Sequence, residues 1–334
     1  KALPQGAVVG ERFEVARNFC NKLWNASRFA LMNLEGYTAA PVSHDQLLVE
    51  DRWLLSRLST VTREVTDYLA AFRYSDVART LYDFAWDEFC SFYVEMLKDR
   101  LSDPEKRPVA QRILAYALDT LLRLLHPITP FVTEQVWQYL NEIAPERGLE
   151  QPTAASESIV IAEWPQPDPD SISDLIESQF ARFQEVLRAV REIRSRQNIP
   201  PKTPVEFAVR CDDATAELLQ PMSTYFSSMA VATSTGFGPD VQPTGLSASA
   251  ALTGMEVFVD LAGHIDVEAE LERTRGNIEK LEKLVEAKKK KLENESFVSR
   301  APEAVVLKER EGLADLEDQL AASRQALAQL EASK

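Results

Sequence analysis

A heptad repeat over residues 265–334 constrains the fold more than any other feature of this sequence. Apolar side chains recur there at alternating steps of four and three in two stretches, residues 267–292 and 306–330. Residues 294–302 interrupt the repeat, and Pro302 is well placed to open a new helix. Two matched arms joined by a short break predict an antiparallel coiled-coil hairpin. At about 1.5 Å per residue each arm reaches roughly 40 Å.

The stretch from Glu11 to about Leu140 predicts a helical bundle. Its apolar residues follow a helical period and it contains almost no glycine. Ser75 is expected to cap the third helix, and the aromatic residues that follow it are expected to form bundle core. Five antiparallel helices with short links would make the bundle. We expect them over about 13–33, 44–72, 75–93, 108–125 and 130–140.

The rest of the chain divides into a linker and a small α/β module. Residues 141–173 are rich in Pro, Ser, Ala and acidic side chains, and Ile159–Ile161 within them is expected to be an isolated strand or a strap across the bundle. The predicted module has helices over about 173–196 and 214–229 and strands at 205–211, 248–252 and 256–261. We therefore expect a mainly α chain with boundaries at 1–12 (a linker), 13–145, 146–172, 173–264 and 265–334.

Composition excludes several classes of protein. The 52 Asp and Glu against 37 Lys and Arg give a net charge of −15, which disfavours nucleic-acid binding over the whole surface but not at local basic patches. The three cysteines and three histidines are scattered, so neither a metal site nor a disulfide is predicted. No catalytic motif is present, and we assign no catalytic residue. Without a membrane span of roughly 20 apolar residues, we expect a cytoplasmic location.

The first helix carries two contrasting faces. One is expected to face the core, with Phe13, Ala16, Cys20, Leu23, Ser27 and Ala30. The other mixes amides, cations and one aromatic ring at spacings of three and four, a mixture that suits unpaired bases because these are read by stacking and by edge hydrogen bonds. The alternative is a solvated face with Phe29 packed against the next helix. The residues of this second face are Asn18, Asn21, Lys22, Asn25, Arg28 and Phe29.

Basic residues also gather near the tip of the predicted hairpin. Lys288, Lys289, Lys290 and Lys291 form a run, with Arg300 beyond the turn and Lys308 on the return arm. Such runs are usually solvated charge on a helix. This one interrupts the apolar seam at Lys288, which favours contact with phosphate groups.

Three motifs resemble one family. Residues 17–29 (RNFCNKLWNASRF) resemble the opening helix of the anticodon domain of valyl-tRNA synthetases, and residues 124–134 (LLHPITPFVTE) resemble a helix-breaking signature shared by the class I synthetases for valine, isoleucine and leucine. Residues 263–266 (GHID), the first arm, and residues 291–298 and 301–303 are similar to the terminal hairpin of the valine family. The resemblance covers nearly the whole chain.

This resemblance implies a tRNA-binding piece of a larger enzyme. The family activates valine with ATP and magnesium and transfers it to tRNA(Val), but its nucleotide-binding and editing parts are absent here, so this chain is expected to be inactive alone and to act with its own catalytic domain. The family reads the second and third anticodon bases. Carried onto this sequence, anticodon contact falls on Lys22, Asn25, Arg28 and Phe29. The resemblance implies that the hairpin rests on the tRNA elbow, although Ala287 and Gly312 stand at positions where a basic residue would favour that contact.

Two alternatives stay open at this point. An isoleucyl-tRNA synthetase has similar anticodon helices, although the long hairpin and the missing cysteine-rich segment disfavour it. A structural protein could use the coiled coil to join subunits or bind partner helices. The matched arm lengths favour pairing within one chain, and hence a monomer.

Overall fold

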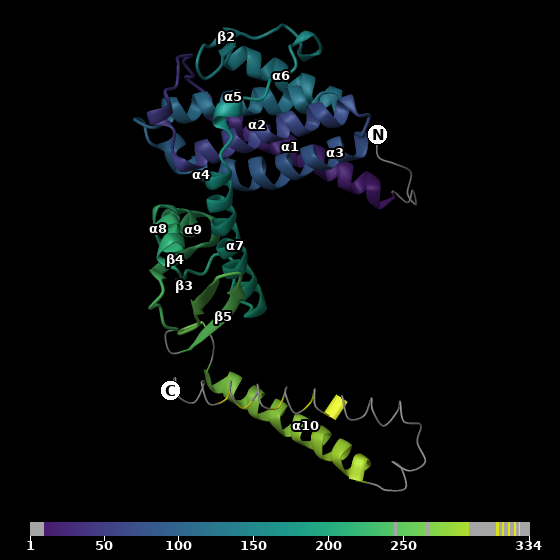
Figure 1. Cartoon of the computed structure of the whole chain (residues 1–334), viewed down its shortest axis with the longest axis vertical. Helices are drawn as coiled ribbons and strands as arrows, with labels where there is room; N and C mark the ends of the chain where they lie inside the picture. The colour runs from purple at the N-terminus through teal and green to yellow at the C-terminus, as the bar shows by residue number, and fades with distance from the viewer. Residues whose placement is uncertain are drawn as a thin grey trace. The chain divides into compact units, whose positions relative to one another are not determined.

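The computed structural model describes residues 10–243, 246–264 and 267–293, and the single positions 312, 313, 316, 320, 324 and 327. Contacts divide the chain into two compact units, residues 1–184 and 185–334. The first unit is mainly helical and the second holds a four-stranded sheet and a long helix (Figure 1).

The first unit is the predicted helical bundle. Its elements are α1 (Glu11–Asn33), η1 (His44–Gln46), α2 (Val49–Ala70), α3 (Tyr74–Asp83), η2 (Phe84–Tyr93), α4 (Val94–Ser102), α5 (Arg107–Leu125), α6 (Pro130–Ile143), β1 (Glu146–Arg147), β2 (Thr153–Ala154), η3 (Ile159–Ile161), η4 (Pro169–Ser171) and the first half of α7 (Asp174–Arg196). Helix α5 is buried along most of its length, so it forms the centre of the core.

Two helix starts differ from the prediction. The second helix begins at Val49, because the Asp51 carboxylate accepts the Leu48 N–H at 3.0 Å and so caps a new helix after the short turn η1. The third begins at Tyr74 with Arg73 as its N-cap, so the predicted cap by Ser75 is wrong.

The third predicted helix contains a π-helical segment. Residues 84–93 form η2, continuous with α3 before it and α4 after it. Phe84, Phe89 and Tyr93 are buried, which confirms that this aromatic stretch contributes to the core. The Ser91 hydroxyl donates to the Trp86 carbonyl, five residues earlier, at 2.7 Å. The wider π turn rotates the following side chains relative to an α-helix, and π segments often mark functional sites.

A buried ion cluster ties α4 to the start of α2. Arg100 Nη1 donates to Asp51 Oδ1 at 2.7 Å and to Glu50 Oε1 at 3.1 Å, and the Tyr93 hydroxyl donates to Asp51 at 3.0 Å. All four side chains are buried. Burial opposes the charge on Arg100, but its bonds to Asp51 outweigh this and raise its pKa.

The segment after α6 runs along the bundle. Ile159–Ile161 forms the 3₁₀ turn η3, capped by Ser158, so the predicted isolated strand is wrong. Hydrogen bonds between this segment and bundle side chains hold it along its length. They run from Trp137 to the Ser156 carbonyl, from Ser59 to the Asp168 carbonyl and from Trp164 to the Thr66 hydroxyl.

The second unit begins within α7 and contains a mixed sheet. Its elements are β3 (Val205–Cys211), α8 (Asp213–Leu219), η5 (Gln220–Met222), α9 (Ser223–Ala230), β4 (Ala232–Gly238), β5 (Ser247–Leu252), β6 (Met255–Asp260) and α10 (Val267–Glu293). The strand order is β4-β3-β6-β5, with β3 parallel to β4 and antiparallel to β6. Strand β4 was not predicted, because most residues of its sequence ATSTGFG are small and glycine is among them.

Helix α10 buries seam positions of the predicted heptads. Ile278, Leu281 and Val285 form a cluster with Leu320 of the following segment. Leu313, Leu316 and Leu327 pack against the same cluster, and Arg324 pairs with Glu282 at 2.7 Å. The apolar cluster thus joins α10 to residues that lie well beyond it in the sequence.

Candidate nucleic-acid interface on α1

Helix α1 packs against η2, α4, α5 and α6. Lys22 and Phe29 on one edge meet η2 and α4, and Trp24 on the other edge meets α6. Its buried stripe is Phe19, Leu23, Ala26, Ser27, Ala30 and Leu34. The predicted stripe was right at Leu23, Ser27 and Ala30, but wrong at Phe13, which is 74% exposed, and at Ala16, which is also exposed. The first turns of α1 extend past the neighbouring helices, so they have no core to enter (Figure 1).

Lys22 lies at the edge of α1 that faces η2. Its Nζ donates to the Ser91 hydroxyl at 2.7 Å and sits 4.0 Å from the centroid of the Trp86 ring. Trp86 in turn stacks on Tyr82, and Tyr82 on Phe19. Partial burial lowers the pKa of Lys22. The ammonium group is therefore held in one place instead of moving freely in solvent.

The other three predicted residues follow Lys22 along the outer side of α1. Asn25 and Arg28 are exposed, whereas Phe29 is half-buried with the Lys98 ammonium 5.8 Å from its ring centroid. The four residues share one side of the helix, since Asn25 is three positions from Lys22 and from Arg28 and four from Phe29. The arrangement offers an amide, two cations and an aromatic ring on a rigid element.

Sequence reasoning missed Trp86 and Ser91, which position Lys22. Both belong to η2 and were counted only as part of an aromatic helix. Their orientation depends on the π turn, for which the sequence carries no simple periodic signal.

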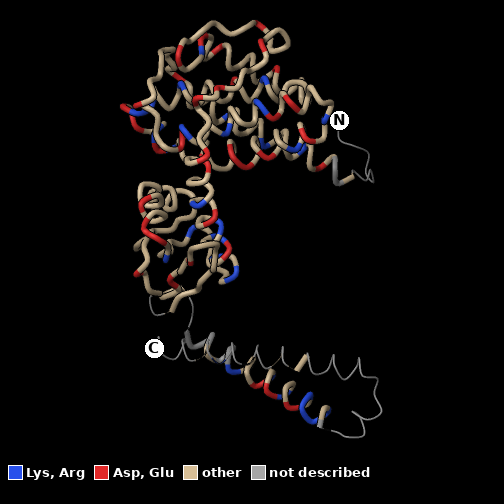
Figure 2. The backbone as a smooth tube through the Cα atoms, viewed as in Figure 1, with Lys and Arg blue, Asp and Glu red and all other residues tan. Residues whose placement is uncertain are grey.

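The predicted basic run lies in the last turns of α10. Lys290 pairs with Glu286 at 2.6 Å, and this hydrogen bond lowers the pKa of Glu286. Figure 2 shows basic and acidic residues alternating along this helix, with basic ones at its end. Lys288 is half-buried, and its ammonium occupies the space that a side chain at Gly312 would need. A side chain at 312 would therefore require the end of the Lys288 side chain to move. Arg300 and Lys308 lie outside the described residues.

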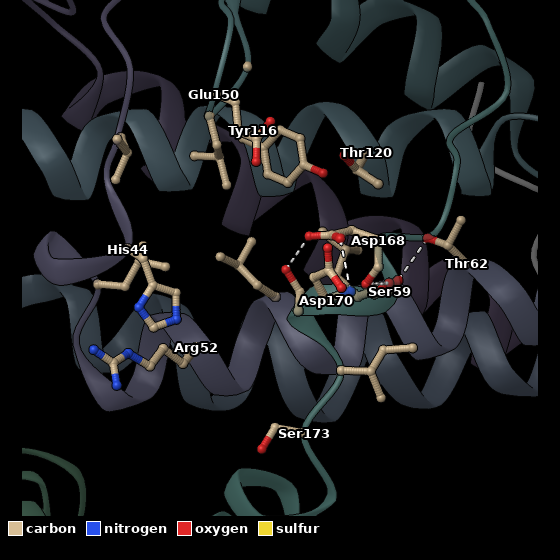
Figure 3. Close-up of a pocket in the computed structure, with 18 of the residues that line it drawn as sticks. His44, Arg52, Ser59, Thr62, Tyr116, Thr120, Glu150, Asp168, Asp170 and Ser173 are labelled. Atoms are coloured by element: carbon tan, nitrogen blue, oxygen red, sulfur yellow. Dashed lines mark hydrogen bonds between the residues drawn. The ribbon is translucent and has the colours of Figure 1, made fainter.

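A cavity of 960 Å³ lies between α2, α5 and the segment that follows α6 (Figure 3). Among its lining residues, the Ser59 hydroxyl donates a hydrogen bond to the Asp168 carbonyl at 2.7 Å. Its acidic lining, Glu150, Asp168 and Asp170, faces only one arginine, Arg52, so it disfavours a polyanion. None of the predicted contact residues that the structure describes lines this cavity.

Two further observations limit the chemistry of the described residues. Within them, no three His, Cys, Asp or Glu side chains gather closely enough to hold a metal ion. Among the helices that the structure describes, none combines the length and the apolar character that crossing a membrane requires.

Comparison with known proteins supplies the family. Residues 51–209 match the family model for the anticodon-binding domain of tRNA ligase, and residues 266–331 match the model for the valyl tRNA synthetase tRNA binding arm. Helix α1 precedes the first of these matches. The two models match separate parts of the chain, and the first match runs past residue 184, where the first structural unit ends.

Whole-chain relatives agree with these models. The chain is 51% identical over 336 residues to the valine-tRNA ligase of Rhodopirellula baltica, covering 100% of this chain and 32% of the relative. It is 36% identical over 324 residues to that of Enterococcus faecalis (96% and 36% covered) and 36% over 322 residues to that of Thermotoga maritima (96% and 35%). It thus spans about a third of the length of the curated relatives it matches. The chain therefore belongs to the valyl-tRNA synthetase family, and corresponds to the part that holds the anticodon-binding domain and the tRNA binding arm.

Proposed function

We propose that this chain is the tRNA-binding part of a valine-tRNA ligase, and that the outer side of α1 contacts the anticodon of tRNA(Val). The observation that carries the proposal is the fixed ammonium of Lys22 between Trp86 and Ser91, next to the exposed Asn25 and Arg28. A lysine ammonium has three donors, and Ser91 uses one. The remaining donors can bind the edge of a base, which is where sequence is read.

The arm would supply a second contact. In this proposal, the segments at α10 and at residues 306–330 form an antiparallel coiled coil that rests on the tRNA elbow through Lys288–Lys291, with Arg300 and Lys308 nearby. The apolar cluster of α10 with Leu320 supports this pairing within one chain, and so a monomer. Lysine binds phosphate as a point charge and carries no sequence information, which suits an elbow contact.

The chemistry of the reaction would belong to the rest of the protein. In the proposed parent enzyme, ATP and magnesium activate valine on the catalytic domain in the cytoplasm, and this chain contributes no catalytic residue. Two separated contacts on one tRNA orient its acceptor end and raise its effective concentration at that domain. The chain thus acts by positioning the substrate.

The anticodon contact is tested with the Lys22→Ala/Arg28→Ala double variant and labelled valine tRNA in fluorescence anisotropy at low salt. Hydrogen bonds to charged groups are worth about 1.5 to 3 kcal/mol, so affinity should fall at least about tenfold. For a tRNA with a changed central anticodon base, the double variant should lose far less affinity. Arg63→Ala, which removes an exposed arginine of α2, is the control and should change neither affinity. Equal losses for both tRNAs would overturn the anticodon assignment.

The arm contact is tested by its dependence on salt. Replacing Lys288–Lys291 with glutamine should weaken the binding of both tRNAs alike and reduce the slope of log affinity against log salt concentration. Lys280→Gln/Lys283→Gln, in an earlier part of α10, is the matched control. An unchanged slope would mean that the run is solvated charge.

A further inference from the structure

A second feature of α1 faces away from Lys22. Along the edge that meets α6, a groove of 290 Å³ is lined mainly by apolar side chains. Trp24 and Met32 of α1 and Tyr139 of α6 form its walls, with Arg28 and Glu142 among its polar lining residues. The Trp24 and Tyr139 rings meet edge to face with centroids 6.3 Å apart, and remain 39% and 40% exposed. Two large aromatic rings thus stay accessible where α1 meets α6.

The groove also holds a buried polar group without a partner. Ser27, which lines it, is 1% exposed, and its hydroxyl has no hydrogen-bond partner among the described residues. A buried hydroxyl left unpaired costs free energy, so such groups are uncommon in folded proteins. The hydroxyl has almost no accessible surface, so a ligand that enters the groove can supply the missing partner only where a lining side chain shifts. The required ligand is therefore flat and apolar, with a polar atom on its edge.

We infer that this groove takes an unpaired nucleobase, namely an anticodon-loop base that flanks those contacted from the Lys22 side. A base has the chemistry that the groove requires, because it can stack on the exposed aromatic rings while its edge approaches the hydroxyl of Ser27. Arg28 belongs both to the outer side of α1 and to the groove, so the two surfaces are continuous. A helix with side chains is about 10 Å across, so neighbouring bases of one splayed loop can lie on its two edges.

Stacking tolerates any base, because every base has a π face. The groove would hold the flanking base without discriminating among bases, and leave selection to the other edge of α1. This inference rests on the proposed function, since it uses the same RNA loop.

The test uses this chain and an RNA hairpin that comprises the valine anticodon stem and loop. The hairpin is made intact and with an abasic site at each loop position in turn. Stacking of one base is worth roughly fivefold in affinity or more. Tyr139→Leu, and separately Trp24→Leu, should weaken the intact hairpin by that factor. One flanking abasic site should weaken the unaltered protein equally, and the two losses should not add.

Phe131→Leu is the matched control, because Phe131 is an aromatic residue of α6 that is 91% exposed and does not line the groove. A fluorescent adenine analogue at the coupled position should be quenched when the unaltered protein binds, a readout that does not depend on the folding of a variant. Binding that is insensitive to both groove variants, with no coupled loop position, would overturn the inference alone and favour a protein partner for the groove. No binding of the intact hairpin by the unaltered protein would overturn the proposed function and the inference together.

Discussion

Removing Arg100 should destabilise the helical unit strongly. Its guanidinium contacts Glu50 and Asp51, whose side chains are 1% and 0% exposed. Arg100→Leu would leave the Asp51 carboxylate buried without this cation. Breaking a buried pair by removing one partner costs about 3 to 5 kcal/mol, because the remaining charge has neither water nor a counter-ion. A unit of 184 residues loses about 2 to 4 °C per kcal/mol, so the melting temperature should fall by about 6 to 20 °C.

Tryptophan fluorescence measures this loss in the unit concerned. All five tryptophans lie in residues 1–184, so urea unfolding followed by their emission reports that unit alone. Lys106→Leu, which removes the exposed pair with Asp103, is the control and should cost less than about 1 kcal/mol. Adding Asp51→Asn to Arg100→Leu should recover part of the loss, since the buried charge that lost its cation is then removed. A loss no larger than that of the control would refute the electrostatic reasoning.

Three further predictions concern single side chains. Ser27→Ala should raise the free energy of urea unfolding by roughly 1 kcal/mol, because it removes an unpaired buried hydroxyl; a decrease would show that the hydroxyl is satisfied. Lys22→Met should weaken tRNA binding without lowering the free energy of unfolding at pH 7. Burial lowers the pKa of Lys22, so its charge disfavours the folded state at neutral pH. This effect is relieved only as the pH rises toward the pKa of Lys22 in the unfolded chain. Burial raises the pKa of the Cys90 thiol to about 12, so iodoacetamide at pH 8 should leave Cys90 unmodified by mass spectrometry, and labelling of the folded protein there would contradict this.

The helices of the first unit could be predicted because their signals are local. Apolar periodicity located α1, α5 and α6 to within a few residues, with Pro108 and Pro130 marking the first turns of the latter two. The predicted base-contacting face of α1 contains Asn25 and Arg28, which are exposed. The aromatic stretch entered the core as expected at Phe84, Phe89 and Tyr93.

Other features depended on contacts between distant residues. Strand β4 exists because it pairs with β3, although its own sequence has little strand character. Phe13 is apolar yet exposed, because it lies in the first turns of α1, which extend past the other described helices (Figure 1). The space at Gly312 is taken by Lys288, which is distant in sequence.

The sequence by itself determined the helical class of the first unit, the heptad seam and the helix that carries the candidate interface, because these follow from residue spacing along one chain segment. Only the tertiary structure decided how the two edges of α1 differ. One edge meets η2, where Trp86 and Ser91 hold the ammonium of Lys22, and the other meets α6, where Trp24 and Tyr139 flank a groove. The physical reason is that each edge takes its chemistry from the helix packed against it, and spacing within α1 does not encode that partner.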